Sequence, residues 1–251
     1  MKVATWNVNG IRARSSQVMS WIDREEPDVI CLQETKASLE QVPEMLLGVA
    51  GYRAKWHGHK GYSGVALLLH EQTFDDVEFS VPAFDVETRI VMATVGELVF
   101  ASVYIPNGGK DYGAKISFLT ALGAWAGELH AAGKRLVLCG DFNVARTDRD
   151  VHPMERRPII GQSHEERDLI DAVFAHELVD VGRLVDPDND RLFTWWAPWR
   201  NRRELNIGWR LDYIAANAGL VDTTTTCRVY REVGTSDHGP VIARLRDSPM
   251  T

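Results

Sequence analysis

The sequence predicts an α+β fold in which two β-sheets pack face to face and helices cover their outer surfaces. Short apolar runs bounded by Gly, Pro, Asp or Asn recur along the chain, with the length and β-branched content typical of strands. Helix-length segments are fewer and do not alternate strictly with the strands, which disfavours a doubly wound sheet. A chain of 251 residues with 45% hydrophobic and 25% charged residues can also bury a large core without disulfides or metals.

We expect strands at the apolar runs, which are residues 2–6, 29–32, 64–69, 90–95, 98–104, 136–139, 211–215, 223–228 and 241–245. We expect helices at residues 15–24, 114–131 and 164–174. The first two have apolar side chains at three- and four-residue spacing, and the third begins with a capping-box pattern from Ser163 to Glu166. No linker rich in Gly, Ser or Pro and no internal repeat divides the sequence, so we expect residues 1–251 to form one domain.

The cysteines and hydropathy indicate a cytoplasmic protein. Cys31, Cys139 and Cys227 are far apart and odd in number, which fits neither a zinc site nor a disulfide framework and favours reduced thiols. No apolar run approaches the roughly 18 residues of a membrane-spanning helix. The N-terminus enters a predicted strand directly, without the pattern of a signal peptide. We therefore expect no membrane association, and a monomer, because no long apolar stripe is left for a partner.

Polar side chains cluster at the ends of six predicted strands. They are Asn7 and Asn9, Glu34, Asn107, Asp141 and Asn143, Asp212, and Asp237 with His238. Turns use Asn, Asp and Gly for conformational reasons, so one such cluster alone would indicate only a loop. Six clusters beside apolar strands instead favour one site at one rim of the sheets.

The residue types of this predicted site favour phosphoester hydrolysis with a hard cation. The carboxylates of Glu34, Asp141 and Asp237 are oxygen donors that suit Mg²⁺ or Mn²⁺, and the Asn amides add neutral oxygens. No second His or Cys accompanies His238, which disfavours a zinc hydrolase. A cation that offsets phosphate charge, a carboxylate that activates water and an imidazolium that neutralises an oxyanion are sufficient for this reaction.

Seven motifs occur in an order that resembles a known family. They are WNVNGIRAR at 6–14, LQETK at 32–36, GYSGVA at 61–66, YIPNG at 104–108, GDFNV at 140–144, GWRLDY at 208–213 and SDHGP at 236–240. Together they resemble the exonuclease III family of abasic-site DNA endonucleases, within the endonuclease/exonuclease/phosphatase superfamily, over about residues 2–245. GDFN and SDH are shared with sugar-phosphate and lipid phosphatases of the superfamily. NGIRA, LQETK and WRLD are more specific to the DNA-repair branch.

The resemblance implies a four-layer α/β sandwich and a Mg²⁺-dependent hydrolysis, with Mn²⁺ as an alternative cation. The substrate it implies is double-stranded DNA containing abasic sites or 3′ ends. The reaction is cleavage 5′ to an abasic site, accompanied by 3′–5′ exonuclease, 3′-phosphodiesterase or 3′-phosphatase activity. Asn9 stands where some members have Asp, which favours a single cation around Glu34 over two.

The resemblance also implies roles for individual residues. Glu34 is the principal metal residue, with Asn9 and Asp237 near the cation. Asp141 orients or deprotonates water with the help of Asn143 and Asn7, while Asp212 orients His238 toward the phosphate, and the choice of Asp141 or His238 as general base stays open. The residues implied to contact the phosphate or the DNA are Tyr104, Asn107, Arg12, Lys36, Tyr62 and Arg210, with Trp195, Trp209 and Leu211 forming an apolar slot for a baseless sugar.

The net charge of −7 counts against a nucleic-acid binder. However, residues 71–87 hold six acidic residues and no Lys or Arg, and residues 165–190 hold nine acidic residues against two arginines. We therefore expect an acidic back and a basic rim. Two alternatives stay open, a catalytically inactive DNA-binding regulator and a phosphatase of lipids or small phosphoesters. The first should have lost one of Glu34, Asp141, Asn143 or His238, and the second should lack the apolar slot.

Overall fold

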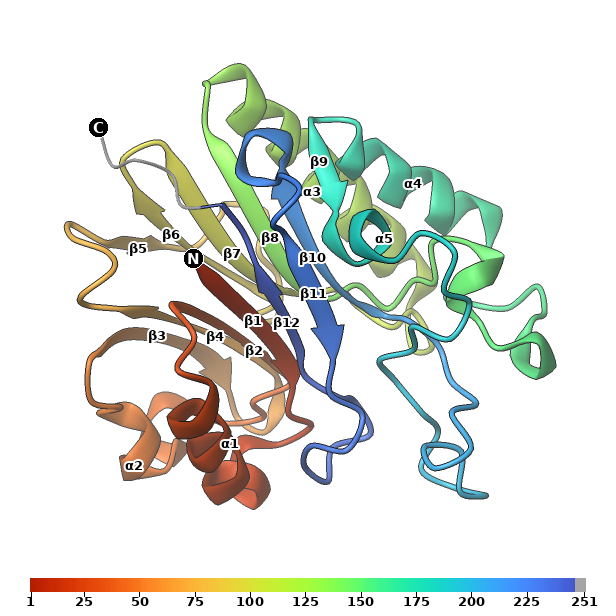
Figure 1. The fold of residues 1–251 in the computed structure, drawn as a ribbon, viewed down its shortest axis with the longest axis horizontal. Helices are drawn as coiled ribbons and strands as arrows, with labels where there is room; N and C mark the ends of the chain where they lie inside the picture. Colours follow the sequence, from red (N-terminus) through yellow and green to blue (C-terminus); the bar gives the residue numbers. More distant parts are fainter. Residues whose placement is uncertain (247–251) are drawn as a thin grey trace.

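The computed structural model describes residues 1–246 and contains two six-stranded sheets with helices on their outer faces (Figure 1). The strands are β1 (Lys2–Asn7), β2 (Val29–Gln33), β3 (Tyr52–His59), β4 (Tyr62–His70), β5 (Glu78–Ser80), β6 (Ile90–Val95), β7 (Leu98–Tyr104), β8 (Arg135–Asp141), β9 (Leu178–Asp180), β10 (Asp212–Asn217), β11 (Thr226–Val229) and β12 (Val241–Arg244). The helices are α1 (Ile11–Glu25), α2 (Glu44–Leu47), α3 (Tyr112–Ala131), α4 (His164–Phe174) and α5 (Val181–Val185).

Both sheets are mixed. The first has the order β11-β12-β1-β2-β4-β3, and the second has the order β5-β6-β7-β8-β10-β9. Each sheet contains one parallel pair, β1 with β2 and β7 with β8, and its other pairs are antiparallel. The predicted α+β class with two packed mixed sheets is therefore confirmed.

Three apolar clusters between the layers hold the sandwich together. The central cluster joins the inner faces of the two sheets and includes Cys31 of β2 and Phe100 of β7. A second cluster lies between the first sheet and α1 and α2, around Trp6 and Trp21, and a third lies beneath α3 and α4. Figure 1 shows α1 and α2 on one side of the molecule and α3 and α4 on the other. The order helix, sheet, sheet, helix is the four-layer arrangement that the resemblance implied.

Most predicted elements are present with shifted ends, and three strands were missed. The edge strand β3 carries Arg53, Lys55 and His57 among its apolar residues, so it does not form the apolar run on which the strand predictions relied. The strands β5 and β9 span only three residues each. The capping box at the start of α4 is confirmed, since Ser163 Oγ accepts a hydrogen bond from Glu166 N. Within residues 1–246, we find no helix of the length and apolarity that crossing a bilayer requires.

The strand register brings the ends of several strands to one edge of the sandwich. In the first sheet, Asn7 of β1 pairs with Gln33 of β2, so the parallel strands end together and Glu34 follows at the same level. In the second sheet, Asp141 at the end of β8 pairs with both Tyr104 of β7 and Asp212 of β10. The polar clusters that are scattered along the sequence therefore meet where the two sheets face each other.

Candidate active site

Asn7 joins the two sheets at the centre of the candidate site. Its buried side-chain Nδ2 donates to Glu34 Oε1 at 2.8 Å and to Asp141 Oδ2 at 2.9 Å. Its Oδ1 accepts the backbone N–H of Asn9 at 3.0 Å, which helps to hold Asn9 in a left-handed conformation with φ 44°. One amide therefore fixes two carboxylates from different sheets and starts the turn that leads into α1.

Glu34 and Asn9 direct oxygen atoms toward one positive charge. Lys36 Nζ lies 2.7 Å from Glu34 Oε2 and 2.6 Å from Asn9 Oδ1. Burial favours a higher pKa for Glu34, but the hydrogen bonds from Asn7 and Lys36 outweigh it and hold this pKa below its usual range. Glu34 is therefore an anion at neutral pH, and carboxylate and amide oxygens are ligands that Mg²⁺ prefers. Ligand atoms of Glu34, Asp141 and His238 also lie within 4.8 Å of one another, so Glu34 lies close to the other two ionisable groups of the site. The oxygens of Glu34 and Asn9 fit a divalent cation.

Asp141 is fully buried beside other acidic groups. Burial raises the pKa of Asp141 to about 7, and the charges of Asp212 and Glu34 act in the same direction, while His238 opposes them. Its Oδ1 accepts the backbone N–H of Asn143 at 2.9 Å, and Asn143 Nδ2 donates to the carbonyl of Ile105 at 2.8 Å. A carboxylate with a pKa near neutrality accepts and releases a proton readily at physiological pH.

His238 is held between two carboxylates. Its Nδ1 lies 2.8 Å from Asp212 Oδ2, and its Nε2 lies 3.8 Å from Asp141 Oδ2. Burial favours a lower pKa, but the charges of Asp212 and Asp141 outweigh it and raise the pKa of His238 to about 10. The ring is therefore an imidazolium at neutral pH, and its Nε2–H points a positive charge at the site. The Thr194 hydroxyl supports this arrangement by accepting the backbone N–H of Asp212 at 3.0 Å.

Asp237 lies behind Asn9. Its Oδ1 accepts from Asn9 Nδ2 at 2.8 Å, and its Oδ2 accepts from Trp195 Nε1 at 3.0 Å. Burial favours a higher pKa, but His238, Trp195 and Asn9 outweigh it and lower the pKa of Asp237. Asp237 thus orients the Asn9 amide and an indole ring, with both of its oxygens already engaged.

Arg89 was not among the predicted site residues, although it contacts two residues that were expected to bind the phosphate or the DNA. Its buried guanidinium lies 4.9 Å from the ring centre of Tyr104 and 5.4 Å from that of Tyr62. Its Nη2 also donates to the Tyr62 hydroxyl at 3.0 Å and to Glu87 Oε2 at 2.8 Å. Burial and the charges of Glu34 and Asp141 raise the pKa of Tyr104 strongly, so its hydroxyl stays protonated. No local pattern around position 89 signals this role, because the stack exists only after β6 pairs with β7 and β4 of the other sheet packs against them.

An apolar cluster borders the acidic centre. Trp209 and Leu211 are buried with Ala145 and Val151, and the partly exposed Trp195 packs on them. The rings of Trp195 and Trp209 meet edge to face with their centres 5.7 Å apart. Because Trp195 also bonds to Asp237, this cluster is directly continuous with the polar site.

Of the remaining residues that were expected to contact DNA, four are accessible at the surface and one is buried. Arg12, Asn107 and Tyr62 are exposed, and Lys36 is half-buried. The expectation that Arg210 contacts DNA is wrong, because its side chain is only 3% exposed and forms ion pairs with Asp150 and Asp180. Trp209 and Leu211, on either side of it, belong to the apolar cluster described above. Because neighbouring side chains of an extended backbone point in opposite directions, the Arg210 side chain points away from that cluster, toward Asp150 and Asp180.

The acidic segments also differ from the expected acidic back. Glu166 is fully buried against Lys115, and Asp180 is buried against Arg210. Asp85 and Glu87 pair with His57 and Arg89. The charges of Glu166 and Asp180 are therefore neutralised inside the protein by partners that are distant in sequence.

Comparison with known proteins identifies the family. Residues 4–238 match the model of the Endonuclease/Exonuclease/phosphatase family, and the chain belongs to this family. It is 33% identical to an exodeoxyribonuclease of Bacillus subtilis, with 96% of this chain and 98% of the relative covered. It is 31% identical to DNA repair nuclease APEX1 of Danio rerio, with 96% of this chain and 81% of the relative covered.

Solved structures agree with this assignment. The 3′–5′ exonuclease NExo from Neisseria meningitidis superposes with a TM-score of 0.87 at 30% identity, covering 98% of this chain and 100% of that one. An AP endonuclease from Archaeoglobus fulgidus superposes with a TM-score of 0.83 at 28% identity, covering 98% and 99%. Both have the two-sheet architecture described above, over nearly the whole of each chain.

Proposed function

We propose that this protein is a Mg²⁺-dependent DNA repair nuclease that hydrolyses the phosphodiester bond 5′ to an abasic site in duplex DNA and also acts on 3′ ends. The observation that carries the proposal is the double hydrogen bond of Asn7 to Glu34 and Asp141, with His238 on the other side of Asp141. This arrangement places three groups in one buried cluster: an anionic oxygen ligand, a carboxyl group whose pKa lies near neutral pH, and a cationic hydrogen-bond donor. Relatives named as a DNA repair nuclease, an exodeoxyribonuclease and an AP endonuclease support the choice of DNA.

In this proposal, each group of the cluster acts through its own charge state. Asp141, with a pKa of about 7, accepts the proton of the attacking water while Asn143 and Asn7 fix its carboxylate. The His238 imidazolium, held by Asp212, donates to a phosphate oxygen as negative charge develops there. Glu34 and Asn9 would hold Mg²⁺, which would supply electrostatic stabilisation of the phosphate charge. Tyr104, as a protonated phenol, donates to the phosphate.

Substrate selection in this proposal depends on the apolar cluster beside the acidic centre. A deoxyribose without a base can rotate out of the duplex at little cost, and an apolar slot accepts it more readily than a nucleotide carrying a polar base. Trp195, Trp209 and Leu211 form this slot, and Arg12, Lys36 and Tyr62 contact the flanking DNA. The alternative function, a phosphatase of lipids or small phosphoesters, would not require such a slot.

The test is incision of a duplex that contains one tetrahydrofuran abasic analogue. We expect incision 5′ to the analogue in Mg²⁺ and none in EDTA. Asp141→Asn and His238→Ala should each lower the rate about 10²–10⁴-fold, in the range of positioned acid–base groups. Asp222→Asn is the matched control, because Asp222 is exposed and lies outside the site.

Two results would contradict the proposal. A wild-type protein that binds the duplex but does not incise it would support an inactive DNA-binding regulator. Near-normal rates in Asp141→Asn or His238→Ala, with the fold intact, would reject the roles given to these residues.

A further inference from the structure

Arg210 lies between Trp209 and Leu211 of the apolar cluster in sequence, and its side chain bonds to Asp150 and Asp180. Its Nε donates to Asp150 Oδ1 at 2.7 Å, and its Nη1 and Nη2 donate to the two oxygens of Asp180 at 2.8 and 2.6 Å. The guanidinium also lies 4.4 Å from the ring centre of Tyr213. A forked, two-point contact of this kind fixes direction as well as distance.

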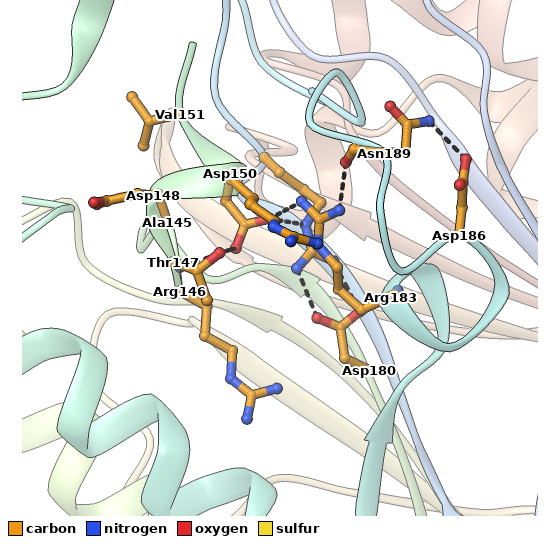
Figure 2. A network of polar contacts seen from close by, with 12 residues as sticks. Ala145, Arg146, Thr147, Asp148, Asp150, Val151, Asp180, Arg183, Asp186 and Asn189 are labelled. Atoms are coloured by element: carbon orange, nitrogen blue, oxygen red, sulfur yellow. Dashed lines mark hydrogen bonds and ion pairs between the residues drawn. The ribbon is translucent and has the colours of Figure 1, made fainter. Parts of the chain in front are cut away.

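The two aspartates are themselves fixed to other parts of the fold. Asp150 accepts from Arg183 Nη2 at 2.6 Å and from the backbone N–H of Thr147 at 2.9 Å. Asp180 ends β9 and caps α5 by accepting the backbone N–H of Arg183 at 3.2 Å. Figure 2 shows Asp150 from one segment of the chain converging with Asp180 and Arg183, which both lie at the junction of β9 and α5. The cluster of Arg210, Asp150, Asp180 and Arg183 contains two positive and two negative groups, so its formal charge is zero.

Backbone contacts transmit the position of this ion cluster to the apolar slot. Arg210 N donates to the carbonyl of Asp150 at 2.7 Å, and Trp209 forms an isolated β-bridge with Val151. Phe142 N donates to the carbonyl of Leu211 at 2.8 Å, directly after Asp141. The slot residues on both sides of Arg210 are therefore connected through the backbone to the segment that carries Asp150.

Burying four charges is a poor way to gain stability, because desolvation consumes most of the attraction, and apolar replacements of similar volume are often equally stable. What ionic contacts supply more reliably is a defined geometry. We propose that the ion cluster around Arg210 is a positioning device for the slot formed by Trp209 and Leu211, and that it sets how strongly the enzyme prefers a baseless sugar over a normal nucleotide. This inference rests on the proposed function.

The experiment compares two substrates in three variants. For each protein, kcat/KM is measured for incision at a tetrahydrofuran site and for removal of a normal nucleotide from a 3′ end, and the ratio is taken. Arg210→Met removes the fork, and Arg210→Lys keeps the charge but not the two-point contact. Lys2→Met is the matched control, because it removes a partly buried cation from an ion pair with Glu25 that includes no residue of the ion cluster or the slot. Thermal unfolding is recorded for all of them.

We expect the ratio to fall about tenfold in Arg210→Met, since small displacements of positioning groups are costly, and to fall less in Arg210→Lys. Lys2→Met should leave the ratio unchanged. An unchanged ratio in both folded Arg210 variants would overturn the inference, as would an equal fall in Lys2→Met or an equal loss on both substrates. If wild-type protein fails to incise the abasic duplex, the proposed function fails first, and the inference fails with it.

Discussion

Replacing Lys115 by Met removes the cation from a carboxylate that has no contact with solvent. Lys115 Nζ lies 2.5 Å from Glu166 Oε1, and both side chains are 0% exposed. Lys115 Nζ also donates to the carbonyl of Asn143 at 2.7 Å. Removing one partner of a buried pair costs about 3–5 kcal/mol, because the other charge is left without compensation. The free energy of unfolding should fall by that amount at pH 8, out of a total of roughly 5–15 kcal/mol for a typical domain.

The pH dependence of this loss gives a sharper test than its size. In the wild-type protein, burial favours a higher pKa for Glu166, but Lys115 and Ser163 outweigh it and lower this pKa. That stabilisation is present above the pKa of the unfolded state and is lost as the pH falls through the folded one. In Lys115→Met, burial acts without Lys115, so the folded carboxyl takes up a proton more readily than the unfolded one. The difference between variant and wild type should therefore shrink from pH 8 to pH 5.

Urea unfolding at pH 5 and pH 8 measures both effects. Glu166→Gln, which leaves a buried ammonium instead, is the reciprocal control, and the double variant Lys115→Met with Glu166→Leu should recover part of the loss. A deficit below about 1 kcal/mol at pH 8, the size of an exposed ion pair, would refute the reasoning. A deficit that grows toward pH 5 would refute the assigned charge states.

Three further predictions concern the candidate site. His238 should remain an imidazolium at pH 8 in metal-free protein, because its pKa is raised to about 10, and NMR titration of its ring measures this charge. The signal of a neutral imidazole at pH 8 would contradict the prediction. Asp212→Asn should lower this pKa and reduce the incision rate about 10²–10⁴-fold, so a variant with wild-type titration and rate contradicts the pairing. Mg²⁺ should raise the unfolding temperature in a concentration-dependent manner in wild-type protein and not in Glu34→Gln. Equal shifts in both proteins would place the cation elsewhere.

Much of the fold was predictable because local pattern and tertiary role coincide. The buried strands β1, β2, β7 and β8 are apolar runs, and any folded arrangement must cover them. The edge strand β3 was not predictable in the same way, because one of its faces is exposed and carries charged residues. Its assignment depends on pairing with β4, which is a tertiary event.

The same distinction applies to the site. Motifs at strand ends are sufficient to indicate Glu34, Asp141 and His238, because their residue types limit the chemistry they can perform. Arg210 stands inside one of those motifs and was expected at the surface, yet the structure buries it against Asp150 and Asp180. Charge alone does not reveal whether a guanidinium faces phosphate or an internal carboxylate.

Residue types and local periodicity were sufficient to predict the α+β class, the family resemblance and the oxygen donors around one histidine. Which of these groups share a charge environment depends on how distant segments pack together. The pKa values of Asp141 and His238, the stack of Arg89 on Tyr104 and the ion pairs of Arg210 all depend on residues that are 15 or more positions apart in sequence. Electrostatic energies depend on distance and burial in three dimensions, and neither quantity is encoded locally in the chain.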